Sequence, residues 1–364
     1  MMPYSRQTKH SQRGLSLVEL MISITLGLVL IAGVLSVFLG SKKSADFNTA
    51  LSGLQESARF AMNSIVSDAR MAGHQGCIDI NSSSAIIRAD AAPTDNFFDS
   101  AVSASEVTSA NSWTPDAPLG FTIPTGNGAP VIGTHAISLQ YGSPETFTIQ
   151  PMGTVADPLV LDNADSGLTV GDLAIVSNCQ VADLFEITGA AGSSLLHAAA
   201  KNRGDNRLSA PFGAAGAVNR ARVMRFEANI YYVGDTGRTD SNGAAVTALY
   251  RQTLPYSNPP IEMVEGVSNL KVKLGFRDPD AGPDLTFVEP QDSAGIPGHV
   301  EAVQIGFLMQ SFDEVAQDDD TRTYFLAGEK LEATNGTPNL ATQYKTDRRL
   351  RLAYNNTVSI RNRR

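Results

Sequence analysis

The chain has 364 residues, enough for one large hydrophobic core or two smaller ones. Hydrophobic residues make up 42% and charged residues 18%, which excludes a disordered chain and a membrane protein with many spans. The formal net charge of -9 argues against general nucleic-acid binding.

The first 14 residues are polar and basic, and an apolar segment follows them. They contain three basic residues and no acidic one, so their removal would change the formal charge from -9 to -12. From Leu15 to Gly40 the only charged side chain is Glu19. These 26 residues would form a helix about 39 Å long, enough to cross a hydrocarbon layer of about 30 Å. The basic flank predicts that the leader stays in the cytoplasm and that the rest of the chain crosses the membrane.

Three interpretations compete for this N-terminus. A secretory signal would be cleaved after the apolar run, but Val34–Ser41 is a poor match to an A-x-A site. A plain signal anchor leaves Glu19 unexplained. A carboxylate inside a membrane costs roughly 2.5–3.5 kcal/mol, so its presence there needs a reason. Cleavage between Gly14 and Leu15 would create an α-amino group about one helical turn from Glu19. That amine and the carboxylate could neutralise each other within one chain or between neighbouring chains.

The run Arg13-Gly14-Leu15-Ser16-Leu17-Val18-Glu19, followed by a long apolar helix, resembles the class III signal of type IV prepilins and pseudopilins. The resemblance implies that a prepilin peptidase cuts after Gly14 and methylates the new terminus at Leu15. It also implies that Glu19, the fifth residue of the mature chain, guides subunit assembly. This family more often has Phe at the first mature position, where the present chain has Leu15.

The helix is predicted to continue past the membrane segment, from about Leu15 to Ala72. Apolar residues recur at spacings of three and four, which is typical of one helix face; they are Phe47, Leu51, Leu54, Ala58, Met62, Ile65 and Ala69. Polar residues, among them Arg59, Asp68 and Arg70, are predicted to lie mainly on the opposite face. Gly73 is expected to end the helix.

The chain has two cysteines, Cys77 and Cys179. If the N-terminus delivers the rest of the chain outside the cytoplasm, an oxidising compartment favours one disulfide between them. Two buried free thiols are the alternative.

The remaining residues predict a β-rich head. The segment from Ile80 to about Thr134 is expected to be loops with short strands, and the segment Gly189–Arg220 an extended surface loop or insertion. Arg222–Val233 and Ala245–Leu254 predict a hairpin around the polar connection Gly234–Gly243. Further strands are expected at Ala136–Tyr141, Thr146–Ile149, Leu173–Ser177, Val181–Thr188, Met263–Phe276, Val300–Ser311 and Arg348–Ile360. The fold class is therefore α+β, with a long N-terminal helical spine packed on a mainly antiparallel sheet, as in pilins.

No catalytic motif is visible, and the five histidines His10, His74, His135, His197 and His299 are scattered. We expect neither an enzyme nor a cofactor. The acidic runs Asp278–Asp284 and Asp313–Asp320 are interpreted as solvated turns in preference to a calcium site, because their spacing fails the EF-hand pattern. The basic C-terminus is interpreted as a solvated strand face in preference to a phosphate or lipid site; its residues are Lys345, Arg348, Arg349, Arg351, Arg361, Arg363 and Arg364.

The second half of the chain resembles PilW-type minor pilins of the type IV pilus. The matching features are the early Cys77, Cys179 before Asp183-Leu184-Phe185, the YYV and LYR strands, EGVSNLKVKLGF, and RRLRLAYNNTVSIRNR. The resemblance implies a low-abundance subunit that primes pilus assembly near the tip. A type II secretion pseudopilin and a signal-anchored periplasmic binding protein remain alternatives.

The predicted organisation is a leader at 1–14, a transmembrane helix at 15–40, an amphipathic continuation at 41–72 and a head at 73–364. The expected location is the inner membrane, with one span and a periplasmic head, and the cell surface after incorporation into a pilus. The implied partners are the prepilin peptidase, the inner-membrane assembly platform, other minor pilins, the major pilin and a tip adhesin.

Overall fold

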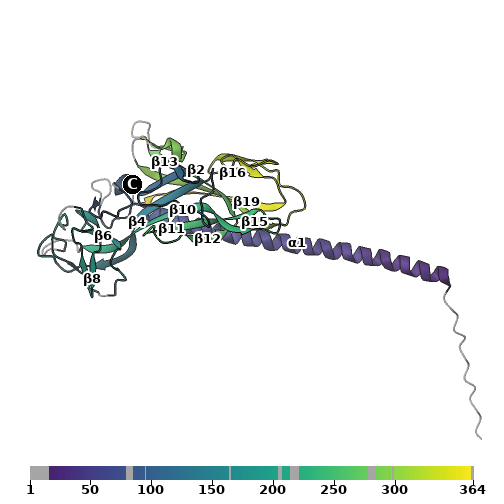
Figure 1. Ribbon diagram of the computed structural model, residues 1–364, viewed down its shortest axis with the longest axis horizontal. Coiled ribbons are helices and arrows are strands. Elements are labelled where there is room, and N and C mark those ends of the chain that lie inside the picture. Colours follow the sequence, from purple (N-terminus) through teal and green to yellow (C-terminus); the bar gives the residue numbers. More distant parts are fainter. Residues whose placement is uncertain are drawn as a thin grey trace, which may run out of the picture. The chain divides into compact units, whose positions relative to one another are not determined.

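Helix α1 is the longest element of the chain. The computed structural model describes residues 16–78, 85–94, 96–163, 165–203, 207–213, 221–277, 284–294, 296 and 299–361. Helix α1 runs as one continuous coil over Leu17–Met71 (Figure 1). Two compact units divide the chain, one ending at Ala50 and the other beginning at Leu51, so the last part of α1 belongs to the same unit as the head. The predicted single long helix is confirmed, within two residues at its start and one at its end.

The last part of α1 packs through the face that the apolar spacing predicted. The helix buries Leu54, Ala58, Ala61, Met62, Ile65, Val66 and Ala69. Gly73 follows the helix with a φ of 77°, in the left-handed region that a residue without a Cβ adopts most easily. Its backbone N–H donates to the carbonyl of Gln140 in the sheet at 2.9 Å. The residues that follow helix α1 are therefore hydrogen-bonded directly to the sheet.

The largest sheet has nine strands in the order β1-β7-β6-β10-β4-β2-β3, with β11 and β12 added along β10. Its strands are β1 Ile86–Ile87, β2 Val102–Ser109, β3 Ser112–Thr114, β4 His135–Thr148, β6 Leu173–Ser177, β7 Ala182–Glu186, β10 Arg222–Thr239, β11 Ala245–Thr253 and β12 Ile261–Glu265. All pairs are antiparallel except β1 with β7. The sheet branches because β10 pairs β4 along one edge, whereas the other edge pairs β6 first and β11 later.

A second sheet has the order β14-β13-β15-β19 and is antiparallel. Its strands are β13 Val267–Arg277, β14 Leu285–Val288, β15 Val300–Glu314 and β19 Arg349–Ser359. Gly266 separates β12 from β13 at a φ of 85°, and a Cβ there would lie 2.6 Å from the carbonyl oxygen of Gln310. The break at Gly266 is why the predicted single strand Met263–Phe276 is two strands that belong to different sheets.

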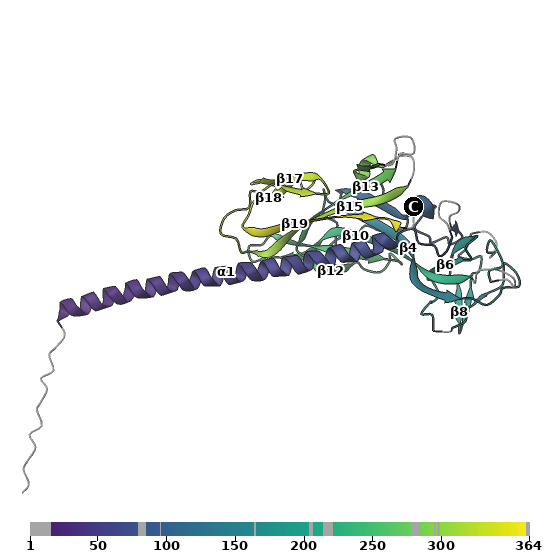
Figure 2. The same cartoon turned by 180° about the vertical axis from the view of Figure 1, so that it is seen from behind.

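Two small sheets complete the described head. One is β16 Tyr324–Leu326, β17 Glu329–Thr334 and β18 Gln343–Lys345, with β17 and β18 parallel, and β16 contacts β15 and β19 (Figures 1 and 2). The other is β5 Leu159–Val160, β8 Gly189–Ala191 and β9 Ser194–Leu196. Short helices α2 at Phe97–Ser100 and η1 at Pro290–Asp292 lie in the connections.

The head has several buried clusters. One surrounds Phe97, Trp113, Phe226 and Tyr232; a second contains Leu159, Phe185, Leu195 and Phe212; a third contains Leu308, Tyr324, Leu331 and Tyr344. The α+β class with a mostly antiparallel head is confirmed, with 43% of the described residues in strands and 19% in helices.

Four predictions about the head need correction. Residues Gly189–Arg220 were expected to form a surface loop, but β8 and β9 form a hairpin there, and Leu195 and Phe212 are buried in the second cluster. The hairpin connection is shorter than Gly234–Gly243, because β10 continues to Thr239. Thr146 and Phe147 belong to one continuous strand, β4, and the predicted strand Met263–Phe276 is divided at Gly266. The short strands expected between Ile80 and Thr134 are present as β1, β2 and β3.

Candidate functional site

The apolar half of α1 is exposed along its length. Leu17 and Leu30 are 74% and 70% exposed, and the surrounding apolar side chains are comparably open. This part of the helix is long and apolar enough to cross a membrane, with a mean hydropathy of 2.6 in its best window. Exposure of such side chains to water is unfavourable, so a membrane or other helices must cover them. The helix is thus suited to membrane anchoring.

Glu19 lies in the first turn of this helix, with its side chain exposed. Ser16 precedes the helix, and its Oγ accepts the backbone N–H of Glu19 at 3.2 Å, as in an N-terminal cap. The hydroxyl of Ser23 donates to the Glu19 carbonyl at 2.8 Å. The helix therefore presents the Glu19 carboxylate at a fixed place in an apolar surface. Gly14 and Leu15 lie outside the described residues, so cleavage, methylation and the amine partner of Glu19 stay predictions.

Asp68 holds the other end of the helix to the nine-stranded sheet. Its Oδ1 accepts the hydroxyl of Tyr141 in β4 at 2.8 Å. Its Oδ2 accepts the hydroxyl of Tyr231 at 2.7 Å and the amide Nδ2 of Asn229 at 2.8 Å, both in β10. Asp68 was predicted to lie on the solvent side of the helix, and this prediction is wrong. A half-buried carboxylate with three donors is a strong polar attachment.

The protonation of the two tyrosines supports this attachment. Burial and then the neighbouring Asp68 carboxylate raise the pKa of Tyr141 well above its usual value, and the same causes raise the pKa of Tyr231. Both phenols therefore remain protonated donors throughout the physiological pH range. Tyr141 also donates to Glu227 Oε2 at 3.2 Å.

A disulfide joins Cys77 to Cys179, across a sequence separation of 102 residues and a Cα–Cα distance of 4.6 Å. Cys77 follows the end of α1 by six residues, and Cys179 lies in the turn between β6 and β7. The side chain of Asn178 supports this turn by accepting the backbone N–H groups of Gln180 and Val181. The disulfide thus fastens the end of the helix to the nine-stranded sheet, and the alternative of two free thiols is not what the structure contains.

The basic C-terminus does not form a solvated face at its centre, and that prediction is wrong for Arg349 and Arg351. Both side chains are buried. Arg349 pairs with Asp240 of the β10–β11 connection, and Arg351 forms an ion pair with Asp347 at 2.7 Å. The guanidinium of Arg351 also lies 4.7 Å from the ring centre of Tyr344. Arg349 thus joins β19 to the β10–β11 hairpin, whereas Arg348 is exposed and pairs with Glu314. Arg363 and Arg364 lie outside the described residues.

A second buried polar cluster joins β4 and β13. Lys271 is 2% exposed, and its ammonium lies 3.3 Å from Glu329 Oε2 and 3.3 Å from His135 Nε2. The backbone N–H of Val272 donates to His135 Nδ1 at 3.0 Å. Burial, followed by the charge of Lys271, lowers the pKa of His135 to about 3. His135 is therefore a neutral structural histidine.

The expected acidic loops give no metal site among the residues that are described. No group of three or more His, Cys, Asp or Glu side chains there could hold a metal ion. Residues 278–283 of the first loop lie outside the described part of the chain. In the second loop, the carboxylate of Asp320 accepts hydrogen bonds from the guanidinium of Arg322 and the hydroxyl of Tyr324.

Two family models match the chain. Residues 9–35 match the prokaryotic N-terminal methylation motif, which covers the end of the leader, Glu19 and the first part of α1. Residues 230–362 match the type IV pilus-assembly protein W family, from the second half of β10 through β19. No curated protein matches the chain. The two matches together support a type IV pilus-related pilin of the PilW type.

Proposed function

We propose that this chain is a non-catalytic minor pilin that acts in type IV pilus assembly, in priming or in the formation of a tip complex. The observation that carries the proposal is Glu19, an exposed carboxylate in the first turn of an exposed apolar helix. This residue lies inside the matched methylation motif. A carboxylate costs free energy in an apolar environment unless it has a partner. If the helices of several subunits assemble in a filament, a neighbouring helix can provide that partner.

The proposed partner is the α-amino group that cleavage between Gly14 and Leu15 would create. It would belong to the same chain or to a neighbouring pilin and would become N-methylated at Leu15. Opposite charges in an apolar surrounding attract strongly, but each is costly when left alone. The basic leader must therefore be removed before Glu19 finds its partner.

The topology follows from the same segment. The leader is residues 1–14, the span is 15–40, the amphipathic continuation is 41–72 and the head is 73–364. The chain crosses the inner membrane once, with its head in the periplasm, and reaches the cell surface when the pilus takes it up. Its proposed partners are the prepilin peptidase, the assembly platform, other minor pilins, the major pilin and a tip adhesin.

The test compares Glu19→Ala with Asp46→Ala, since both remove an exposed acid from α1 and only the first lies in the apolar half. Sheared surface pili from cells that express each full-length variant are probed for the protein, with membrane levels as the reference. We expect Glu19→Ala to reduce incorporation by at least about tenfold, because an unpaired charge in an apolar surrounding costs about 3–5 kcal/mol. Asp46→Ala should incorporate normally. Equal incorporation of both variants would contradict the assembly role of Glu19.

A further inference from the structure

An interruption in the nine-stranded sheet creates an opening beside β10. Along one edge, β10 pairs with β6 as far as Arg225, and its pairing with β11 begins at Asn229. The three residues between, Phe226–Ala228, pair with β4 on the other edge. They have no paired strand on the interrupted edge among the described residues. β11 ends at Thr253, and Leu254 and Pro255 follow it at the side of the opening.

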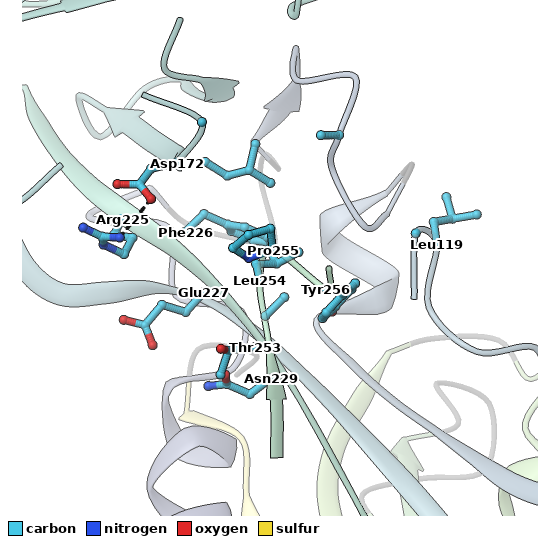
Figure 3. Close-up of a pocket in the computed structure, with 15 residues that line it drawn as sticks. Leu119, Asp172, Arg225, Phe226, Glu227, Asn229, Thr253, Leu254, Pro255 and Tyr256 are labelled. Carbon is cyan, nitrogen blue, oxygen red and sulfur yellow. Dashed lines mark hydrogen bonds and ion pairs between the residues drawn. The ribbon is translucent and has the colours of Figure 1, made fainter. Parts of the chain in front are cut away.

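A cavity of about 440 Å³ fills this opening (Figure 3). Its apolar wall is formed by Leu173, Phe226, Leu254 and the ring of Tyr256. Its size falls within the range of about 300–1,000 Å³ that pockets for specific ligands occupy. The opening thus has room for one large side chain and part of its neighbours.

The rim of the cavity is also apolar, although it faces water. Leu119 lines the rim and is 53% exposed, and Val170, next to the lining residue Gly171, is 60% exposed. A hydrophobic hollow with an exposed apolar rim is typical of a protein interface, in which one anchoring side chain enters a pocket. A small molecule would leave this rim in water, whereas a second protein would cover it.

The polar side of the cavity carries an excess of negative charge. Arg225 pairs with Asp172 at 3.0 Å, and both line the cavity opposite Tyr256 and Leu119 (Figure 3). Glu227 also lines it, and Tyr141 donates to only one of its oxygens. Two carboxylates and one guanidinium therefore favour a basic residue on whatever docks here.

We propose that the opening between β6 and β11 is a socket for one large apolar side chain of a neighbouring pilin-like subunit, which carries a Lys or Arg beside it. The inference rests on the proposed function, because the neighbouring subunit is a pilin of the same assembly. The socket is far along the chain from Glu19, so the two contacts are separable by mutation.

The experiment places a photo-crosslinking benzophenone residue at Leu119 in the full-length chain, in cells that assemble pili. A matched control places it at Leu196, an exposed apolar residue of β9 that does not line the cavity. Incorporation of each variant into sheared pili is measured first. If the unmodified chain is absent from pili, the result counts against the proposed function. The socket proposal is tested separately, by the crosslinks that form from variants found in pili.

We expect Leu119, and not Leu196, to crosslink to another pilin-like subunit, at an apolar residue next to a Lys or Arg. Glu227→Gln keeps an acceptor for Tyr141 and should lower the yield about two- to fivefold, the effect of one partly exposed charge pair. The socket proposal would be overturned by equal crosslinking from both positions or by no crosslink at all. It would also be overturned by a crosslink only to a second copy of this chain or to an unrelated protein.

Discussion

The hydroxyl of Tyr231 in β10 donates a 2.7 Å hydrogen bond to Asp68, three residues before the end of helix α1. This bond and those from Tyr141 and Asn229 make Asp68 the polar attachment between the outer part of the helix and the sheet. The apolar helix face supplies area, but the three directed bonds fix where along the sheet the helix lies.

Asp68→Ala should destabilise the head by about 2–3 kcal/mol, because the buried hydroxyl of Tyr231 loses its acceptor, whereas Tyr141 keeps Glu227 and Asn229 keeps the Tyr141 hydroxyl. Tyr231→Phe removes one bond and one donor together, so it should cost only about 1 kcal/mol. Thermal unfolding of the full-length protein in detergent, followed by near-ultraviolet circular dichroism, measures both. Asp46→Ala, on the exposed part of α1, is the control. A loss for Asp68→Ala no larger than that of the control would contradict the attachment.

Removal of the disulfide should lower stability by about 4–5 kcal/mol in the chain-entropy model, since its loop closes about 100 residues. The Cys77→Ser, Cys179→Ser double variant and the reduced wild-type protein should melt at similar, lower temperatures. A thiol-labelling assay confirms the redox state before each melt. A reductant that lowers the melting temperature of the double variant as much as that of the wild type would show that the effect does not come from this bond.

His135 makes stability depend on pH in the acid range. Because burial and Lys271 lower the pKa of His135 from its usual 6.5 to about 3, the unfolded chain binds a proton between these values and the folded chain does not. Stability from this group is therefore complete above about pH 6.5 and falls as the pH drops toward 3, by roughly 3–5 kcal/mol in total.

The measurement is the melting temperature between pH 7.5 and 4.5 for the wild type and His135→Gln. The glutamine can still accept the N–H of Val272 but cannot titrate. Lys271 and Glu329 lie beside His135. Both are present in the wild type and in the variant, so their own titration affects the two profiles equally. Glutamine should flatten the profile, and two parallel profiles would show that His135 is not the titrating group.

The proposed function predicts that processing depends on Gly14. Gly14→Val should leave the precursor uncut, heavier than the mature protein by the mass of its 14-residue leader, and excluded from pili. Intact-mass spectrometry of membrane fractions distinguishes the two forms and also reads methylation of Leu15. Gly27→Val is the matched control, because a Cβ at Gly27 meets no atom within 4 Å. Normal cleavage of the Gly14 variant would place the processing site elsewhere.

The long helix and most strands could be predicted from sequence because each has a strong local period. The apolar spacing from Phe47 to Ala69 gave the buried face, and Gly73 gave the end of the helix. The hairpin of β10 and β11 had turn residues between two β-rich runs. These signals lie within a few residues of each other, so no tertiary information is needed.

The polar attachments could not be predicted in the same way. Asp68 is polar and sits among polar residues of the helix, but its donors come from residues 141, 229 and 231, far along the chain. Arg349 and Arg351 have the composition of a solvated strand, and only the fold brings Asp240 to the first and Asp320 to the second. Burial of charge is decided by such distant partners.

The link between Cys77 and Cys179 also determines how tension would pass through the head. A pull on helix α1 reaches Cys77 six residues after the helix ends and crosses the disulfide to the turn beside β6. From there it enters the middle of the nine-stranded sheet, because β6 pairs with β10. The disulfide therefore gives a covalent route from helix α1 to β6 that does not pass through β2, β3 or β4. The loops that join these three strands can differ in length between relatives without lengthening that route.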